Sequence, residues 1–200
     1  MIRIREIAPE DAGNLLKLMQ ELDREADYLL FEPGERPAEE SAMREHIRKL
    51  DPPEFGTFFA AESLAAEAGD VVATAPEPEP GETGTTADAE APSSGSTGEM
   101  AGYLEIRRLP WRRVRHRAYL VIGILKRFGG QGVGTRLMQE AESWARRHGV
   151  RRLYLTLVAE NTAAVALYRK MGYEIEGRHP ASMKLGDRFV EELTMGKWLD

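Results

Sequence analysis

The chain has 200 residues, contains no cysteine and carries a net charge of −6 at pH 7. This length suits one domain with an ample core, and the lack of cysteine excludes disulfides, thiolate zinc sites and a cysteine nucleophile. The first residues alternate like a strand and do not resemble a signal peptide, and no apolar run approaches the ~20 residues of a membrane span. We therefore expect a cytoplasmic protein without a membrane partner.

The N-terminal part predicts one strand, two helices and a second strand. Residues 2–7 alternate as a strand, and Pro9 with two following acids opens a helix, because proline and acids favour a first turn. A second helix is predicted over 38–50 and a strand over 57–64. The apolar positions expected to face the core in the two helices are Leu15, Leu18, Met19, Leu22, Met43, Ile47 and Leu50.

Residues 65–98 have a different composition from the rest of the chain. They are rich in Pro, Glu, Gly, Ser, Thr and Ala and contain no aromatic residue. Such a segment buries too little apolar surface to offset its conformational entropy. We therefore predict a single domain over residues 1–200 that carries a disordered, acidic insertion at 65–98, either an inert linker or a contact for a basic partner.

The C-terminal half predicts strands and helices in alternation, closed by a hairpin with its turn near Gly186. Residues 133–148 form an amphipathic helix that Gly149 ends, and Asn161 is the expected N-cap of the next helix. The predicted order over the whole chain is β-α-α-β-β-β-α-β-α-β-β. The predicted ranges in this half are strands 100–109, 116–125 and 153–158, helices 133–148 and 161–171, and the hairpin strands 173–177 and 189–198.

A glycine-rich run follows the apolar strand 118–125. Gly130, Gly132 and Gly134 stand at every second position, where backbone amides can approach a ligand without an intervening Cβ. At a helix N-terminus these amides form an anion site, so the run predicts a phosphate-bearing ligand. Thr135-Arg136 stands where a P-loop requires Lys-Ser/Thr, and Thr135 stands where a Rossmann fingerprint requires its third glycine.

The run instead resembles the loop of the GCN5-related N-acetyltransferase (GNAT) superfamily, usually written Gln/Arg-x-x-Gly-x-Gly/Ala. It maps onto Gly129-x-x-Gly132-x-Gly134, with Gly129 in place of the usual Gln or Arg. A second family motif, Asn-x-x-Ala-x-x-Leu-Tyr-x-x-x-Gly-Phe/Tyr, matches residues 161–173. The resemblance covers residues 100–200 by motif and 1–64 by pattern. It implies an α/β (α+β) fold with a central mixed, mostly antiparallel sheet flanked by helices.

The resemblance also implies transfer of an acetyl group from acetyl-CoA to an amine, with no metal. Tyr168 corresponds to the tyrosine that lies near the sulfur of coenzyme A and serves as the acid for the leaving thiolate. The helix pattern alone leaves a second interpretation open, because Tyr168 also belongs to an apolar stripe. The residues expected to bind the cofactor are Ile122, Ile124, Arg127, Gly129, Gly130, Gln131, Gly132, Val133, Gly134, Thr135, Asn161 and Tyr168, with Arg136 as a further phosphate contact.

The general base stays open between three alternatives. Glu105 lies on the strand before the loop, at a position where some family members place acids. His116 has a suitable intrinsic pKa for taking up a proton. Many relatives use an ordered chain of water instead, in which case no single side chain is essential.

The charge distribution along the chain bears on which ligands and partners the protein binds. Residues 51–105 contain no Lys or Arg, whereas basic residues dominate 107–152, which favours attraction of coenzyme A to that half. We expect no nucleic-acid partner, because no aromatic stacking motif accompanies the arginines. Glu191 and Glu192 are candidates to attract a cationic acceptor. The acceptor stays unidentified, a homodimer is common among relatives, and a non-catalytic acetyl-CoA sensor or scaffold is the competing interpretation.

Overall fold

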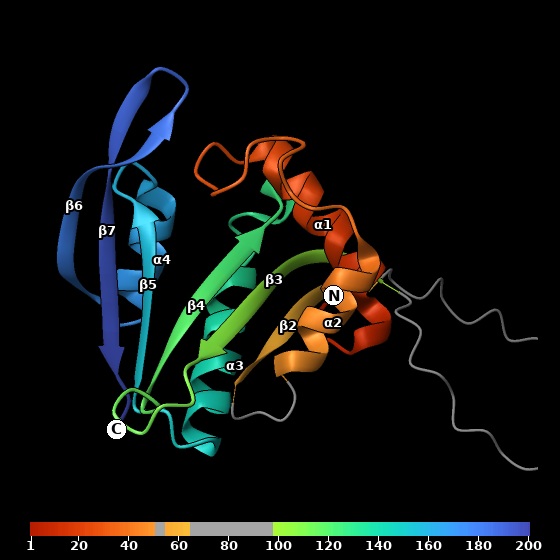
Figure 1. Ribbon diagram of the computed structural model, residues 1–200, viewed down its shortest axis with the longest axis horizontal. Helices are drawn as coiled ribbons and strands as arrows, with labels where there is room; N and C mark the ends of the chain where they lie inside the picture. Colours follow the sequence, from red (N-terminus) through yellow and green to blue (C-terminus); the bar gives the residue numbers. More distant parts are fainter. Residues whose placement is uncertain (51–54, 65–97) are drawn as a thin grey trace, which may run out of the picture.

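The computed structural model describes residues 1–50, 55–64 and 98–200 (Figure 1). Its elements follow the predicted order of strands and helices, so the fold prediction is confirmed. Most of the predicted insertion, residues 65–97, lies outside the described residues. The bounds are β1 Ile2–Glu6, α1 Ala12–Glu25, α2 Glu40–Leu50, β2 Gly56–Ser63, β3 Glu99–Arg108, β4 Arg117–Ile124, α3 Val133–Arg147, β5 Arg152–Val158, α4 Thr162–Lys170, β6 Glu174–Leu185 and β7 Arg188–Trp198.

The strands form one seven-stranded sheet in the order β1-β2-β3-β4-β5-β7-β6. All neighbouring strands are antiparallel except β4 and β5, which are parallel because α3 crosses between them. The sheet is therefore mixed and mostly antiparallel, as predicted.

Two hydrophobic clusters lie on opposite faces of this sheet. One contains Leu15 and Leu22 of α1 and Ile47 of α2, and the other contains Leu137 and Trp144 of α3. Central strand β3 is buried on both faces because it separates the two clusters. The fold is thus a sheet between two helical layers, and each layer can contribute side chains to a site at the sheet.

Strands β4 and β5 pair over only three residues. Hydrogen-bonded register covers Arg117 to Tyr119 of β4 against Arg152 to Tyr154 of β5. Beyond this point β4 still pairs with β3, and β5 still pairs with β7. The two ribbons separate toward the ends of both strands (Figure 1). In the part of the chain that the structure describes, the β5-facing edge of β4 from residue 120 onward has no strand partner.

Two local boundaries differ from the prediction. Residues Pro9–Asp11 form a 3₁₀ turn before α1, rather than the first turn of that helix. Strand β6 continues to Leu185, although the sequence pattern predicts its end at residue 177. Pro180 interrupts the expected pattern, and the ladder accommodates it through a register shift between His179 and Met183. The hairpin turn at Gly186 is confirmed, with φ of 57° at that residue.

Within the described residues, no helix is long and apolar enough to cross a membrane.

The packing predicts very different costs for removing two tryptophans. Trp144 is 1% exposed in the core beneath α3, whereas Trp111 is 70% exposed. Trp144→Ala should lower the free energy of unfolding by about 3–5 kcal/mol, since it removes a large buried ring and leaves a cavity. Trp111→Ala should change it by less than about 0.5 kcal/mol. Equilibrium urea denaturation measures both, and similar losses would contradict the assigned core.

Candidate active site

The glycine-rich run forms the connection from β4 to α3. A short 3₁₀ turn follows β4, and Gly130 and Gly132 then adopt φ of 72° and 78°, in the left-handed region that favours glycine. Gly132 is the N-cap of α3, a helix of 15 residues. The predicted arrangement of strand, glycine loop and helix is confirmed.

The loop presents unpaired backbone donors. The amides of Phe128 and Gly129 donate to carbonyls within the loop, and the amide of Arg136 donates to the carbonyl of Gly132. Between the described residues, no hydrogen bond engages the amides of residues 130–135. Together with the positive end of the α3 dipole, these donors are suited to an anion such as a phosphate.

A cavity of about 580 Å³ adjoins these amides, and we call it the loop cavity. Its walls come from the end of β4, the glycine loop and α4. Two lysines, Lys126 and Lys170, line it beside the loop. The predicted cofactor residues on its walls are Ile122, Ile124, Gly129, Gly130, Gly132, Val133, Gly134, Thr135, Asn161 and Tyr168.

Three other side chains that the sequence predicts to contact phosphate are instead bound to other groups of the protein. Arg127 pairs with Glu21 and Glu99, and the side-chain amide of Gln131 donates to the carbonyl of Arg127. Arg136 donates to the carbonyl of Ile2 at 2.6 Å. None of the three side chains lines the loop cavity. Sequence reasoning preferred these residues and missed the lysines, although Lys126 is adjacent to Arg127 and Lys170 lies in the second motif.

A second cavity of about 370 Å³ borders both β4 and β5 where the two strands separate. We call it the aromatic cavity, because Tyr28, Phe31, Phe58, Tyr103 and Tyr119 contribute to its walls.

The two cavities have four wall residues in common, which are Ile122, Asn161, Ala164 and Tyr168. The two cavities therefore adjoin at a junction that includes Tyr168.

Asn161 and Tyr168 are held at this junction by α4. The side-chain oxygen of Asn161 accepts a hydrogen bond from the amide of Ala164 at 3.1 Å, which confirms the predicted N-cap. Tyr168 is 5% exposed, and burial raises the pKa of its phenol above the usual value. The phenol therefore stays protonated at neutral pH and can donate a hydrogen bond.

Glu105 occupies the wall of the aromatic cavity, on the strand that the sequence predicts over 100–109. The strand that leads directly into the loop is β4, and Glu105 lies on neighbouring β3. Its side chain is 2% exposed, with Oε1 2.8 Å from His46 Nε2 and 2.5 Å from Arg107 Nε. Burial raises the pKa of Glu105, but hydrogen bonds from His46 and Arg107 outweigh it and hold the pKa below the usual value. Glu105 is thus a weak proton acceptor.

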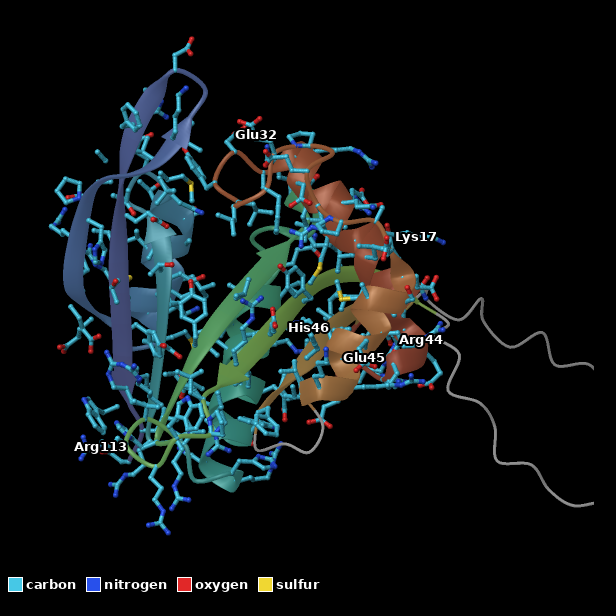
Figure 2. The ribbon with its side chains drawn as sticks, viewed as in Figure 1. Lys17, Glu32, Arg44, Glu45, His46 and Arg113 are labelled. Carbon is cyan, nitrogen blue, oxygen red and sulfur yellow. The ribbon has the colours of Figure 1, made fainter. Side chains whose placement is uncertain are left out.

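The other predicted base, His116, is not brought to the site. Its ring stacks on Trp198 with centroids 6.2 Å apart, and it lines neither the loop cavity nor the aromatic cavity. The adjoining arginines Arg112 and Arg115 border a separate cavity with it. Arg113, labelled in Figure 2, lies near the end of the chain that Figure 1 marks C. These arginines therefore lie away from the loop cavity.

The two neighbouring acidic residues of β7, Glu191 and Glu192, lie in different environments. Glu192 lines the aromatic cavity and accepts a hydrogen bond from the hydroxyl of Ser182. Glu191 pairs with Arg178 at 2.6 Å. Only Glu192 is therefore placed to meet a ligand in the aromatic cavity.

The region that contains both motifs is similar to known proteins. The model of the Acetyltransferase (GNAT) family matches residues 86–173. The chain is 37% identical over 86 residues to the N-alpha-acetyltransferase RimI of Mycobacterium tuberculosis, covering 41% of this chain and 50% of RimI. It is 34% identical over 84 residues to the L-amino acid N-acetyltransferase AaaT of Escherichia coli, covering 40% and 50%. The matches span between 20% and 50% of the length of these and other curated relatives.

Solved structures resemble the whole chain. A GNAT-family acetyltransferase from Streptococcus pneumoniae superposes with a TM-score of 0.78 and 26% identity, and the match covers 100% of both chains. A phosphinothricin acetyltransferase from Sinorhizobium meliloti, solved with acetyl-CoA, has a TM-score of 0.72 at 16% identity, covering 99% of this chain and 88% of its own. The sheet, the glycine loop and the order of the elements define the acetyltransferase fold. Residues 86–173 thus resemble the GNAT family in sequence, and the whole chain has the fold of a GNAT-family acetyltransferase.

The loop geometry predicts that Gly132→Asp weakens binding of coenzyme A about tenfold or more. The carboxylate would lie beside amides suited to a phosphate, and the left-handed φ would strain any side chain. Gly149→Asp is the matched control, because Gly149 has φ of 68° and lies beyond the other end of α3. Isothermal titration calorimetry measures both. Unchanged affinity in Gly132→Asp would remove the loop from the binding site.

Proposed function

We propose that this protein transfers an acetyl group from acetyl-CoA to a primary amine by direct attack of the amine. The observation that carries the proposal is the wall common to two cavities, with Tyr168 in that wall. One cavity lies on unpaired amides suited to phosphate, and the other has room for a small second substrate. The match of residues 86–173 to the acetyltransferase family model supports acetyl transfer as the reaction.

Acetyl-CoA occupies the loop cavity in this proposal. Its pyrophosphate accepts hydrogen bonds from the amides of residues 130–135, with Lys126 and Lys170 supplying positive charge. The pantetheine arm follows the unpaired edge of β4 at Ile122 and Ile124, where backbone donors and acceptors are available. This path brings the thioester to the junction of the two cavities.

Tyr168 acts as the acid in the transfer step. The amine attacks the thioester carbonyl carbon, and the leaving thiolate needs a proton. The phenol is buried at the junction and protonated at neutral pH, so it can supply that proton. Asn161, which also borders both cavities, bounds the space in which the two substrates meet.

The acceptor binds in the aromatic cavity and carries its amine on a small molecule or at a peptide N-terminus. Relatives act on L-methionine sulfoximine or L-methionine sulfone, on L-amino acids and on N-alpha amines, as their names state. A cavity of about 370 Å³ with several aromatic walls suits an acceptor with a modest apolar side chain.

The test measures release of coenzyme A from acetyl-CoA with three amines, namely L-methionine, spermidine and the peptide Ala-Ala-Ala. Tyr168→Phe should lower kcat about 10²-fold or more and retain acetyl-CoA affinity, since it removes only the proton donor. Tyr173→Phe is the control, because Tyr173 is also buried and its hydroxyl has no hydrogen-bond partner in the described residues. Tyr173→Phe should keep full turnover.

Two outcomes would count against the proposal. Equal turnover in Tyr168→Phe and the parent would remove Tyr168 as the acid. Tight binding of acetyl-CoA without acetyl transfer to any of the three amines would favour the non-catalytic sensor instead.

A further inference from the structure

His46 reaches the wall of the aromatic cavity from α2, a helix that sequence reasoning used only for core packing. Its Nε2 atom lies 2.8 Å from Glu105 Oε1 on β3, which is 59 positions away in the chain. Its ring meets the buried ring of Phe58 edge-on, with centroids 5.5 Å apart. In Figure 2, His46 projects from α2 toward the central strands. Two contacts on different strands thus fix the orientation of the imidazole.

The protonation of Glu105 determines which nitrogen of His46 carries a proton. The pKa of Glu105 lies below its usual value, so at neutral pH the side chain is a carboxylate and can only accept hydrogen bonds. Its partners are His46 Nε2 and the guanidinium of Arg107. Nε2 must therefore donate, which leaves Nδ1 of the neutral imidazole as an acceptor. Nδ1 has no hydrogen-bond partner among the residues described.

The carboxylate of Glu105 is buried, whereas the imidazole of His46 is partly exposed, as a group that meets a substrate must be. Glu105 is 2% exposed and His46 is 41% exposed, so the carboxylate is enclosed and the imidazole meets the solvent of the cavity. The other charged walls of the aromatic cavity are Arg107 of β3, Arg36 of the α1–α2 connection and Glu192 of β7. Arg36 pairs with Asp23 at 2.6 Å. The titratable tyrosines on these walls are Tyr28, Tyr103, Tyr119 and Tyr168.

We propose that His46 is the general base of the transfer and that Glu105 is the residue that positions it. This inference rests on the proposed acetyltransferase function and assigns the proton acceptor that the sequence left open. A carboxylate that holds an imidazole in one tautomer and stabilises its protonated form is an established way to make histidine an effective base. The base comes from the α1–α2 layer, whereas the acid Tyr168 comes from α4.

Nδ1 of His46 takes one proton from the ammonium of the acceptor, and the free amine attacks the thioester carbonyl carbon. The C–N bond forms and the C–S bond breaks, and the sulfur leaves with the electron pair and takes the phenolic proton of Tyr168. The second proton lost by the nitrogen restores the phenol through solvent, and His46 releases its proton to solvent.

His46→Gln tests the assignment with the same three amines and with hydroxylamine, a nucleophile that is already uncharged at neutral pH. With the amines, kcat/KM should fall about 10²-fold, and the loss of rate toward acidic pH that we expect in the parent should be absent from the variant. Acetylation of hydroxylamine and affinity for acetyl-CoA should stay at the parent's level, because neither requires a base. Retained acetyl-CoA affinity also shows that the variant is folded.

Two further variants separate a base from a structural contact. His116→Gln removes a histidine outside both cavities and should leave turnover unchanged. Glu105→Gln should lower kcat/KM with the amines, and the double variant with His46→Gln should be no slower than His46→Gln alone, because Glu105 acts through His46.

Three results would overturn the assignment. These are unchanged amine turnover in His46→Gln, an equal loss with hydroxylamine, and multiplied losses in the double variant. If the parent itself released no coenzyme A with any amine or with hydroxylamine, the proposed acetyltransferase function would fail as well. If the parent is active and His46→Gln matches it, only the base is wrong.

Discussion

The hydrogen bonding between β4 and β5 stops after three residue pairs, and the candidate site depends on that early stop. A continuous parallel ladder would saturate the edge of β4 and leave no space between the strands. Because β3 holds the other edge of β4 and β7 holds β5, the two strands can separate without loss of the sheet. The split gives room for two cavities that meet at Tyr168, and the free edge of β4 supplies backbone groups to a ligand.

The two helical layers contribute different chemistry to this split. The layer of α3 and α4 supplies the unpaired loop amides, Lys170 and Tyr168, which suit the phosphate and thiol ends of coenzyme A. The layer of α1 and α2 supplies His46, which meets Glu105 on the face of β3 that this layer covers. The residues proposed for the acid and the base therefore come from different helical layers, and both line the aromatic cavity. The substrates would meet where the strands of the sheet part.

The local sequence pattern was sufficient to predict much of the fold and part of the candidate site. Alternation and helical periodicity predicted every strand and α-helix of the described residues in order. The glycine spacing predicted the turn into α3, because positive φ at Gly130 and Gly132 is a local requirement. Strand β6 was predicted too short, since Pro180 interrupts a strand pattern that a register shift restores. A bulge of this kind depends on the partner strand and leaves little signal in the strand itself.

The side chains of the site were less predictable, because their partners lie far away in the sequence. Arg127 is adjacent to the loop, yet Glu21 of α1 and Glu99 of β3 bind its guanidinium. His116 had a suitable chemistry but lies at the opposite end of β4 from the loop. The pairing of His46 with Glu105 spans 59 positions and carries no motif. Only the three-dimensional arrangement of α2 over β3 brings them together.

A crystal structure of the protein with bound coenzyme A tests the central claim most directly. We predict the pyrophosphate on the amides of residues 130–135, the pantetheine arm along the free edge of β4 and the sulfur beside Tyr168 at the opening into the aromatic cavity. Coenzyme A bound elsewhere, for example in the separate basic cavity that Arg112 and Arg115 border, would contradict the account.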